Sequence, residues 1–227
     1  MLFLVLGRGK TGSIVAEVAK ERGHGVRVLG EEENGNASAL TAPFLAGFDV
    51  VIDFTTPEAV VSNLRACLAN GARVVVGTTG WYAHLNDMRE LARRKGAGFL
   101  YGTNFSVGVQ AMLRVARELA LAAPDYRFHI TETHHISKKD APSGTALSIK
   151  QVLESANPAL KVDITSKREG DASGIHTIEA RSQNDLIELK HEAFSRRGFA
   201  EGAVRAAEWL AGKTGVWEFS EIAGKLS

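Results

Sequence analysis

Residues 2–12, LFLVLGRGKTG, join an apolar run to a glycine-rich turn, and this junction decides the fold class. A short apolar run predicts a buried strand, and glycines between a strand and a helix are the context of a dinucleotide-binding turn. Glycine lets the backbone approach a diphosphate, whose charge then faces the amides and positive dipole end of the helix. A turn that only joins strand to helix is the alternative that this segment leaves open.

Short apolar runs alternate with longer segments of helical period from Leu2 to about Tyr101. This alternation is typical of a parallel sheet covered by helices, so we expect a Rossmann-like α/β domain over residues 1–104. The expected strands are 2–6, 26–29, 49–54, 73–77 and 98–102, and the expected helices are 14–23, 57–71 and 84–96.

The pattern changes after Asn104 and indicates a second domain over residues 105–195. We expect an α+β domain with a mixed, largely antiparallel sheet, because helical segments are followed by strands of alternating polarity. The expected helices are 105–123 and 144–156, and the expected strands are 127–135, 161–169, 174–182 and 185–193. A C-terminal helix within 196–227 carries small and apolar residues and is expected to pack back on the first domain.

Composition and charge exclude several classes of partner. The 227 residues include 27 Lys and Arg against 26 Asp and Glu, so the net charge of +1 provides no long-range field for nucleic acid or an acidic membrane. No apolar stretch is long enough to span a bilayer, and the apolar start precedes the first basic residue, the reverse of a secretory signal. The single cysteine, Cys67, cannot form an intrachain disulfide. We expect a cytoplasmic protein with a small-molecule ligand.

Further candidate cofactor residues follow the other strands. Glu31 lies 19 residues beyond Gly12, about where a ribose-binding carboxylate is expected. Acidic residues at 31–33 would repel the extra phosphate of NADPH, so the sequence favours NADH, although Lys10 partly offsets this charge. For Glu32 and Glu33 a solvated loop is the stronger interpretation. The candidates of the first turn and of the strand-ending turn at 77–79 are Gly7, Gly9, Lys10, Thr11, Gly12, Gly77, Thr78 and Thr79.

Residues 132–145, ETHHISKKDAPSGT, are the most informative stretch for chemistry. Adjacent histidines and a lysine supply proton donors near neutral pH, and a Ser-Gly-Thr helix start offers amides to a carboxylate. The alternative is that these residues have no catalytic role: one histidine is buried in the core, the other is exposed to solvent, and the lysine lies on the surface. His176 and His191 lack metal-ligand spacing, so we predict no metal site.

Six segments together resemble the 4-hydroxy-tetrahydrodipicolinate (dihydrodipicolinate) reductase family. They are the glycine turn, IDFTTPE at 52–58, GTTG at 77–80, TNFSVGV at 103–109, THHISKKDAPSGTA at 133–146 and KREG at 167–170, in the family's order. The resemblance implies that His134 and Lys138 donate protons. It also implies that His135, Lys138, Ser143, Gly144 and Thr145 hold the substrate's carboxylates. To the cofactor residues it adds Phe54, Thr55, Thr103, Asn104 and Phe105.

The implied activity is the NADH- or NADPH-dependent reduction of dehydrated 4-hydroxy-tetrahydrodipicolinate in diaminopimelate and lysine biosynthesis. The chain departs from the family at Leu6, a usual glycine, and at Ile136, a usual arginine, and it lacks a basic residue after the second strand. Residues 170–191 are shorter than usual, so the expected homo-oligomer is a tetramer by resemblance or a dimer. Two alternatives stay open at this point: a dehydrogenase or imine reductase for another small acid, and a cofactor-sensing regulator.

Overall fold

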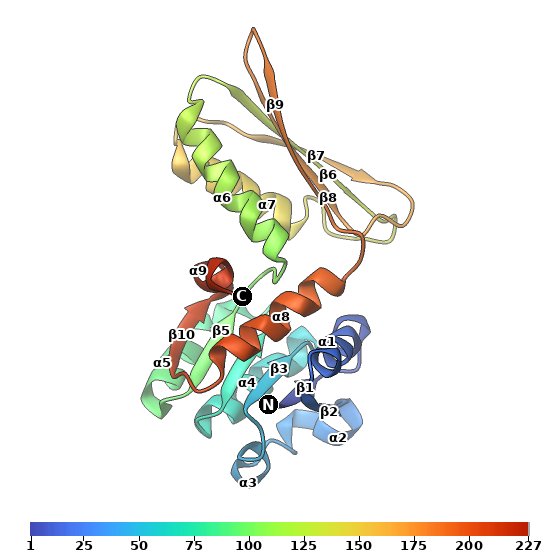
Figure 1. Cartoon of the computed structure of the whole chain (residues 1–227), viewed down its shortest axis with the longest axis vertical. Helices are drawn as coiled ribbons and strands as arrows, with labels where there is room; N and C mark the ends of the chain where they lie inside the picture. Colours follow the sequence, from blue (N-terminus) through green and yellow to red (C-terminus); the bar gives the residue numbers. More distant parts are fainter. Residues whose placement is uncertain (227) are drawn as a thin grey trace. The chain divides into compact units, whose positions relative to one another are not determined.

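The computed structural model describes residues 1–226, which divide into two compact units (Figure 1). The first unit contains residues 1–106 and 197–226, and the second contains residues 107–196. The chain therefore leaves the first unit once and returns to it. No helix among the described residues is long and apolar enough to cross a membrane.

The first unit is built on a six-stranded sheet in the order β10-β5-β4-β3-β1-β2, with every pairing parallel. Its strands are β1 (Leu2–Leu6), β2 (Gly25–Leu29), β3 (Val50–Asp53), β4 (Arg73–Val76), β5 (Gly98–Tyr101) and β10 (Gly215–Glu218). Every residue of β3 and β5 is buried, as expected for central strands covered on both faces. The expected Rossmann-like sheet is confirmed.

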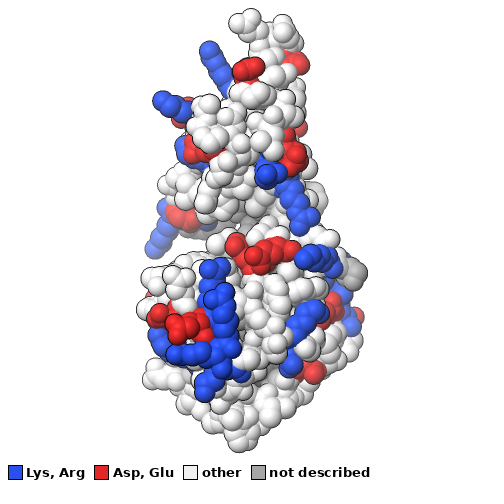
Figure 2. Space-filling model, turned by 90° about the vertical axis from the view of Figure 1, so that its left-hand side faces the viewer, with Lys and Arg blue, Asp and Glu red and all other residues white. Residues whose placement is uncertain are grey.

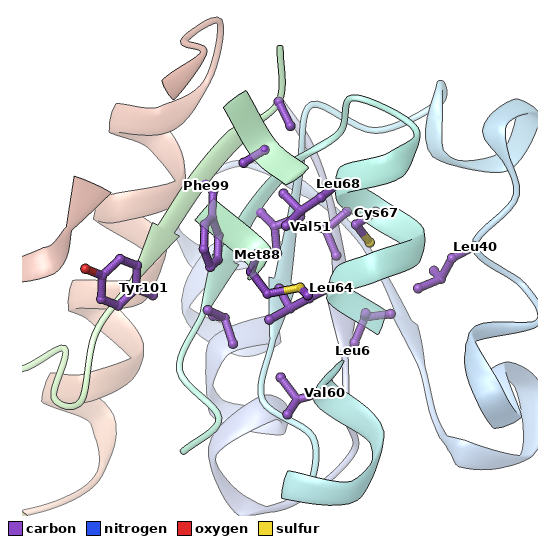
Figure 3. Close-up of a cluster of buried hydrophobic side chains, with 14 of the residues drawn as sticks. Leu6, Leu40, Val51, Val60, Leu64, Cys67, Leu68, Met88, Phe99 and Tyr101 are labelled. Atoms are coloured by element: carbon purple, nitrogen blue, oxygen red, sulfur yellow. The ribbon is translucent and has the colours of Figure 1, made fainter. Parts of the chain in front are cut away.

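Helices cover this sheet. They are α1 (Lys10–Glu21), α4 (Pro57–Ala69), α5 (Leu85–Lys95) and α8 (Arg197–Leu210), with short turns α2 (Glu31–Asn34), η1 (Gly35–Ala37), α3 (Ala42–Leu45) and η2 (Tyr82–His84). Helix α4 packs on β3, β4 and α5, and it contributes Leu64, Cys67 and Leu68 to the core beside Val51 and Phe99 (Figure 3). Burial of these apolar side chains is the main stabilising contribution to the unit.

Helix α8 packs against α1 and over β3 and β4. Arg22, just beyond α1, donates from Nε and Nη2 to both carboxylate oxygens of Glu208 on α8, at 2.8 and 2.7 Å. His24 Nε2 also lies 2.7 Å from Glu208 Oε1. The returning segment is thus fixed to the first helix by a bidentate ion pair as well as by apolar packing.

The segment after α8 differs from the single helix expected within 196–227. The helix ends at Leu210, Gly212 has φ +76°, and residues 215–218 form β10 beside β5. Short helical turns α9 (Phe219–Ile222) and η3 (Ala223–Lys225) follow. A positive φ suits glycine and ends the helix, which leaves residues 215–218 free to extend the sheet.

The second unit packs two helices on a four-stranded sheet in the order β7-β6-β8-β9. Its elements are α6 (Val107–Ala122), β6 (Arg127–His134), α7 (Gly144–Ala156), β7 (Asp163–Arg168), β8 (Ile175–Arg181) and β9 (Leu186–Glu192). Strands β6 and β7 are parallel, whereas the β6–β8 and β8–β9 pairs are antiparallel. The expected mixed, largely antiparallel sheet is confirmed.

One face of this sheet, here called the inner face, is buried against α6 and α7. Alternate residues of β6 and β8 point inward because side chains of a strand alternate between the faces. Ile130 and Ile178 pair across the strands and pack with Ile149 and Leu153 of α7. At one end of the inner face the apolar residues give way to polar ones, which are described below.

Candidate active site

The turn after β1 lies where the sheet's strand order reverses, between β1 and β3. Gly7 has φ +103°, and a Cβ atom placed on it would come within 2.2 Å of the Phe54 carbonyl oxygen. A Cβ on Gly12 would come equally close to the Gly7 carbonyl oxygen. Both positions therefore require glycine, and the turn packs backbone against backbone at the edge where open parallel sheets bind ligands.

Gly9 faces open space instead. It is the N-cap of α1 in extended conformation, a Cβ on it would meet nothing within 4 Å, and no side chain caps the helix. The amides of Lys10, Thr11 and Gly12 begin α1 and have no acceptor within the helix. Lys10 is exposed and Thr11 is half-buried. These residues fit a diphosphate, because helix N-terminal amides and the helix dipole favour an anion.

A cavity of about 660 Å³ opens beside this turn. The turns after β1, β2 and β3 line it, and they include Gly7, Arg8, Gly9, Gly30, Glu31, Glu32, Phe54 and Thr55. Of the cofactor residues predicted from sequence, Gly7, Gly9, Glu31, Phe54 and Thr55 thus come together around one cavity. Its volume suits the adenosine part of a dinucleotide.

An ion pair lies at the rim of this cavity. Arg8 Nη2 lies 2.7 Å from Glu33 Oε2, and the same oxygen accepts a hydrogen bond from the Gly30 amide at 2.8 Å. The Gly30 amide, helped by Arg8, holds the pKa of Glu33 below its usual range. Sequence reasoning left Glu33 as a solvated residue and did not consider Arg8. No sequence motif predicts a contact between Arg8 and Glu33, so this ion pair could not be inferred from the sequence.

A buried polar chain supports the cavity wall and was missed from sequence. Asp53, fully buried at the end of β3, accepts hydrogen bonds from the Thr55 amide and hydroxyl, the Thr78 hydroxyl and the Asn63 amide, at 2.7 to 3.0 Å. Asn63 in turn accepts from Asn34 at 3.0 Å. Burial raises the pKa of Asp53, and these hydrogen bonds oppose the rise. The chain joins α4 to the acidic turn at residues 31–34.

The remaining predicted cofactor residues lie outside the lining of this cavity. The Phe54 ring covers Gly77, where a Cβ would lie 2.2 Å from ring carbon Cζ, and Thr79 and Thr103 are exposed. Asn104 accepts the Ser106 amide at 2.8 Å. Phe105 is buried, with its ring centroid 4.6 Å from that of Phe219. The Phe105 side chain is therefore part of the core.

The second unit gathers the other candidates at the polar end of its inner face. Glu132 and His134 point to the same face of β6, because they are two residues apart on a strand. Glu132 pairs with Ser166 of β7 and His176 of β8, and His176 pairs with His191 of β9. Strand register thus places a row of polar side chains across all four strands.

Glu132 is 0% exposed and is surrounded by donors. Its Oε1 accepts from Nη2 of Arg168 at 2.9 Å and from the Ser143 amide at 3.3 Å, and its Oε2 accepts from Nδ1 of His134. Arg168 also donates to the carbonyl oxygens of Lys138 at 3.3 Å and Asp140 at 2.6 Å. One buried carboxylate and one guanidinium therefore hold β6, the start of α7 and the 135–143 loop together.

His134 is buried but keeps one edge accessible. Burial, with smaller contributions from Lys138 and Arg168, lowers the pKa of His134, while Glu132 opposes this effect. Gly174, with φ +145°, lies across from the ring, and a Cβ there would come within 3.0 Å of Nε2 of His134. A side chain at residue 174 would cover this nitrogen, so the glycine leaves it approachable.

The other candidates lie in the 135–143 loop and the first turn of α7, and of these Lys138 acts electrostatically on His134. Lys138 Nζ lies 2.8 and 2.9 Å from the two carboxylate oxygens of Asp140, and His135 Nδ1 lies 2.8 Å from the Ser137 hydroxyl. Gly144 opens α7 and faces open space, while Thr145 is half-buried beside it. A cationic side chain and a helix N-terminus are thus available to a ligand with carboxylates.

Ser143 caps α7 and joins it to β8. Its hydroxyl accepts from the Ala146 amide at 3.2 Å and lies 3.1 Å from Nε2 of His176. Burial, with a smaller effect of the neighbouring His134 charge, lowers the pKa of His176 to about 4. His176 is therefore neutral near pH 7 and is part of the frame. Sequence reasoning missed Glu132, Arg168 and His176, although the two-residue spacing from Glu132 to His134 on a strand was a usable signal.

The types of ligand that the site can bind are limited by how its potential metal-binding side chains are grouped and by its surface charge. Within residues 1–226 no group of three or more His, Cys, Asp or Glu side chains is placed to hold a metal ion. Basic and acidic side chains are interspersed on the face shown in Figure 2. With a net charge of +1, and with charges of both signs mixed on this face, local groups are the source of attraction here for an anionic ligand.

Comparison with known proteins identifies similar chains along almost the whole sequence. The protein-family model of the dihydrodipicolinate reductase N-terminus matches residues 3–105, and the family model of its C-terminus matches residues 108–222. A 4-hydroxy-tetrahydrodipicolinate reductase of Christiangramia forsetii is 35% identical, with 100% of this chain and 99% of that protein covered. One of Natronomonas pharaonis is 37% identical, with 92% and 94% covered. In fold, the chain is similar to a dipicolinate-bound dihydrodipicolinate reductase of a Paenisporosarcina species, with a TM-score of 0.83, 24% identity, and 98% and 99% covered.

Proposed function

The chain belongs to the 4-hydroxy-tetrahydrodipicolinate reductase family, and from this premise we propose how its residues divide the reaction. It is an NAD(P)H-dependent oxidoreductase of diaminopimelate and lysine biosynthesis. The two alternatives, another small-acid dehydrogenase and a cofactor-sensing regulator, are not favoured, because the relatives match along the full chain. The observation that carries the proposal is the buried Glu132–His134 pair beside Lys138 and the start of α7.

The first unit binds the dinucleotide in this proposal. Gly7 and Gly12 let the backbone form the turn, the amides that begin α1 hold the diphosphate, and Glu31 accepts hydrogen bonds from the adenosine ribose. The lack of room for a Cβ at Gly7 and Gly12, where it would lie 2.2 Å from a carbonyl oxygen, and the open space at Gly9 support this fit. When bound, the reduced nicotinamide supplies a hydride to the substrate.

The second unit binds the dicarboxylate. Lys138, His135 and the first turn of α7 at Gly144 and Thr145 neutralise the two carboxylates. The charge of Lys138, the free approach to Gly144 and the helix dipole support this assignment. The similar fold of a reductase that binds dipicolinate, a ring with two carboxylates, is consistent with it.

His134 supplies the proton. Loss of water from the 4-hydroxy ring gives an unsaturated imine. One carbon–carbon double bond of this imine then gains a hydride and a proton. The hydride leaves an electron pair in the ring, and His134 Nε2 donates its proton to that pair, becoming neutral. Lys138 stabilises the developing negative charge and shares in proton supply. A positioned acid of this kind contributes about 10² to 10⁴ in rate.

The acidic rim favours NADH over NADPH. Glu31 and Glu32 line the cavity where the ribose is proposed to bind, and Arg8, which also lines it, is already paired with Glu33. A 2′-phosphate would meet like charge, and it would have to compete with Glu33 for Arg8.

The protein forms a homo-oligomer in the cytoplasm, as a tetramer or a dimer. Support comes from the edge strand β9, on which Leu186 and Ile187 are exposed large apolar residues. Light scattering on the purified chain measures the oligomer, and a monomer at micromolar concentration would exclude this part of the proposal.

The activity test couples enzymatic synthesis of the precursor to absorbance of the nicotinamide at 340 nm. The wild type should oxidise NADH, while His134→Gln and Lys138→Ala should lose turnover and keep their affinity for NADH in calorimetry. No oxidation of either cofactor by the wild type would reject the function. Equal loss of NADH binding in both variants would reject the division between the units.

A further inference from the structure

Glu132 is a buried carboxylate to which the proposed reaction so far assigns no step. We propose that Glu132 is a positioning residue for the reduction: it holds the Nδ1 proton of His134 and so presents Nε2 of that ring to the substrate. This inference rests on the proposed role of His134 as the proton donor.

The contacts of Glu132 show that it is held as an ionised acceptor. Arg168 and the Ser143 amide occupy Oε1, which leaves Oε2 for the Nδ1 proton of His134. Although burial alone raises it, the pKa of Glu132 stays below its usual range, because Arg168, Ser166 and His134 hydrogen-bond to the carboxylate. A carboxylate with donors on both oxygens has a fixed orientation and therefore fixes the ring that it contacts.

Fixing Nδ1 determines which nitrogen reacts. When Nδ1 carries the proton that faces Glu132, the neutral ring has its lone pair on Nε2, and the second proton of the charged ring is also on Nε2. Nε2 is the nitrogen that faces Gly174, where any Cβ would approach it to 3.0 Å. The carboxylate and the glycine thus act on opposite edges of one imidazole: Glu132 holds Nδ1, and Gly174 keeps a side chain away from Nε2.

Glu132 also opposes the positive groups around His134. Arg168 of β7 and Lys138 of the 135–143 loop are the cations that act on the ring, and the neutral His176 of β8 lies 5.2 Å from it between ring centroids. His191 of β9 lies beyond His176, and Asp140 of the loop pairs with Lys138. Burial, Lys138 and Arg168 disfavour the charged ring, and Glu132 is the group in direct contact that favours it. Without the carboxylate, the proton on Nε2 would be lost at a lower pH.

Glu132→Gln tests the proposal, because the amide keeps the volume and an oxygen for Arg168 and Ser143. Its NH₂ group then faces Nδ1 and prevents that nitrogen from carrying a proton. We expect kcat to fall roughly 10²-fold, with a smaller change in KM for the dicarboxylate and unchanged NADH affinity. The high-pH limb of the kcat profile should move to lower pH, and Glu132→Asp should recover part of the activity. Glu154→Gln, which removes a carboxylate near α7's far end, is the matched control with wild-type kinetics.

Wild-type kcat and an unshifted pH profile in a folded Glu132→Gln protein would overturn the proposal. If that variant does not fold, nitrogen-15 NMR of the wild-type histidine rings provides the test, with the His134 signal assigned from its loss in His134→Gln. A neutral His134 protonated on Nδ1 supports the inference, and one protonated on Nε2 overturns it. This measurement needs no turnover, so it separates failure of this inference from failure of the proposed function.

Discussion

The carbonyl oxygen of Phe54 lies 2.2 Å from the position that a Cβ on Gly7 would occupy, whereas a Cβ on Gly9 would meet no atom within 4 Å. These two glycines of one turn therefore serve different needs. Gly7 is required by the fold itself, through its neighbour and its φ of +103°. Gly9 leaves room for a ligand.

Alanine at the two positions should separate stability from binding. Gly7→Ala combines a steric clash with an unfavourable φ and should lower the free energy of unfolding by about 3 kcal/mol or more. Gly9→Ala should change it by less than about 1 kcal/mol, yet raise Kd for NADH roughly tenfold, because the methyl group occupies the approach to the amides. Urea denaturation and calorimetric NADH titration measure the two effects. Tight NADH binding by Gly9→Ala would contradict the assigned diphosphate site.

Glu33→Gln should shift cofactor preference toward NADPH. The change removes one negative charge and frees Arg8, which lies 2.7 Å from Glu33, to pair with a 2′-phosphate. The ratio of kcat/KM for NADPH to that for NADH should rise roughly tenfold, and adding Arg8→Ala should reverse most of the gain. Glu90→Gln breaks the exposed ion pair with Arg94 and serves as control. An unchanged ratio in Glu33→Gln would place the ribose elsewhere.

His176 should make the fold sensitive to acid. Its pKa is about 4 in the folded protein, below the usual 6.5 of the unfolded chain, so the unfolded state binds the proton more tightly. The stability contributed by neutral His176 is present above pH 6.5 and is lost as pH falls toward 4, by an amount on the order of 3 kcal/mol. His176→Gln should flatten the dependence of Tm on pH in this window. A dependence as steep as that of wild type would show that other groups cause it.

Asn63→Leu should destabilise the first unit. Leucine would leave Oδ2 of Asp53 without its donor at 2.9 Å and Nδ2 of Asn34 without its acceptor at 3.0 Å, both in a buried setting. We expect a loss of roughly 3 kcal/mol in the free energy of unfolding. Ser62→Ala on the same helix removes only a hydrogen bond to Ala59 and should cost less than about 1 kcal/mol. Equal effects of the two substitutions would argue against the buried chain as a stabilising element.

Most of the fold could be predicted, because the spacing of apolar residues along the chain depends directly on which faces of the strands and helices are buried. The five strands expected in the first unit are present as β1 to β5, within one or two residues of their expected limits. Strand β10 was not predicted, since GVWE is short and lies in a segment dominated by helical pattern. Its pairing with β5 depends on the path of the returning chain, which local sequence does not encode.

The site residues could be predicted where reactive side chains lie close together in the sequence. They were harder to predict where the contacts join different strands. The stretch 132–145 drew attention by its histidines, lysine and helix start. Arg168 lies 36 residues from Glu132, and only the parallel register of β6 and β7 brings them together. Likewise, Arg8 reaches Glu33 because β1 and β2 are neighbours that end at the same edge. Such pairs can be identified only when the tertiary structure shows which strands are neighbours.

The return of residues 197–218 to the first unit has a consequence for the order of synthesis. When residues 1–106 leave the ribosome, their sheet lacks β10 and α8 has not yet covered β3 and β4. The intervening residues 107–196 are continuous and contain their whole sheet, so they can complete their core first. A released chain that ends at residue 196 should therefore resist protease over residues 107–196 while residues 1–106 are still digested.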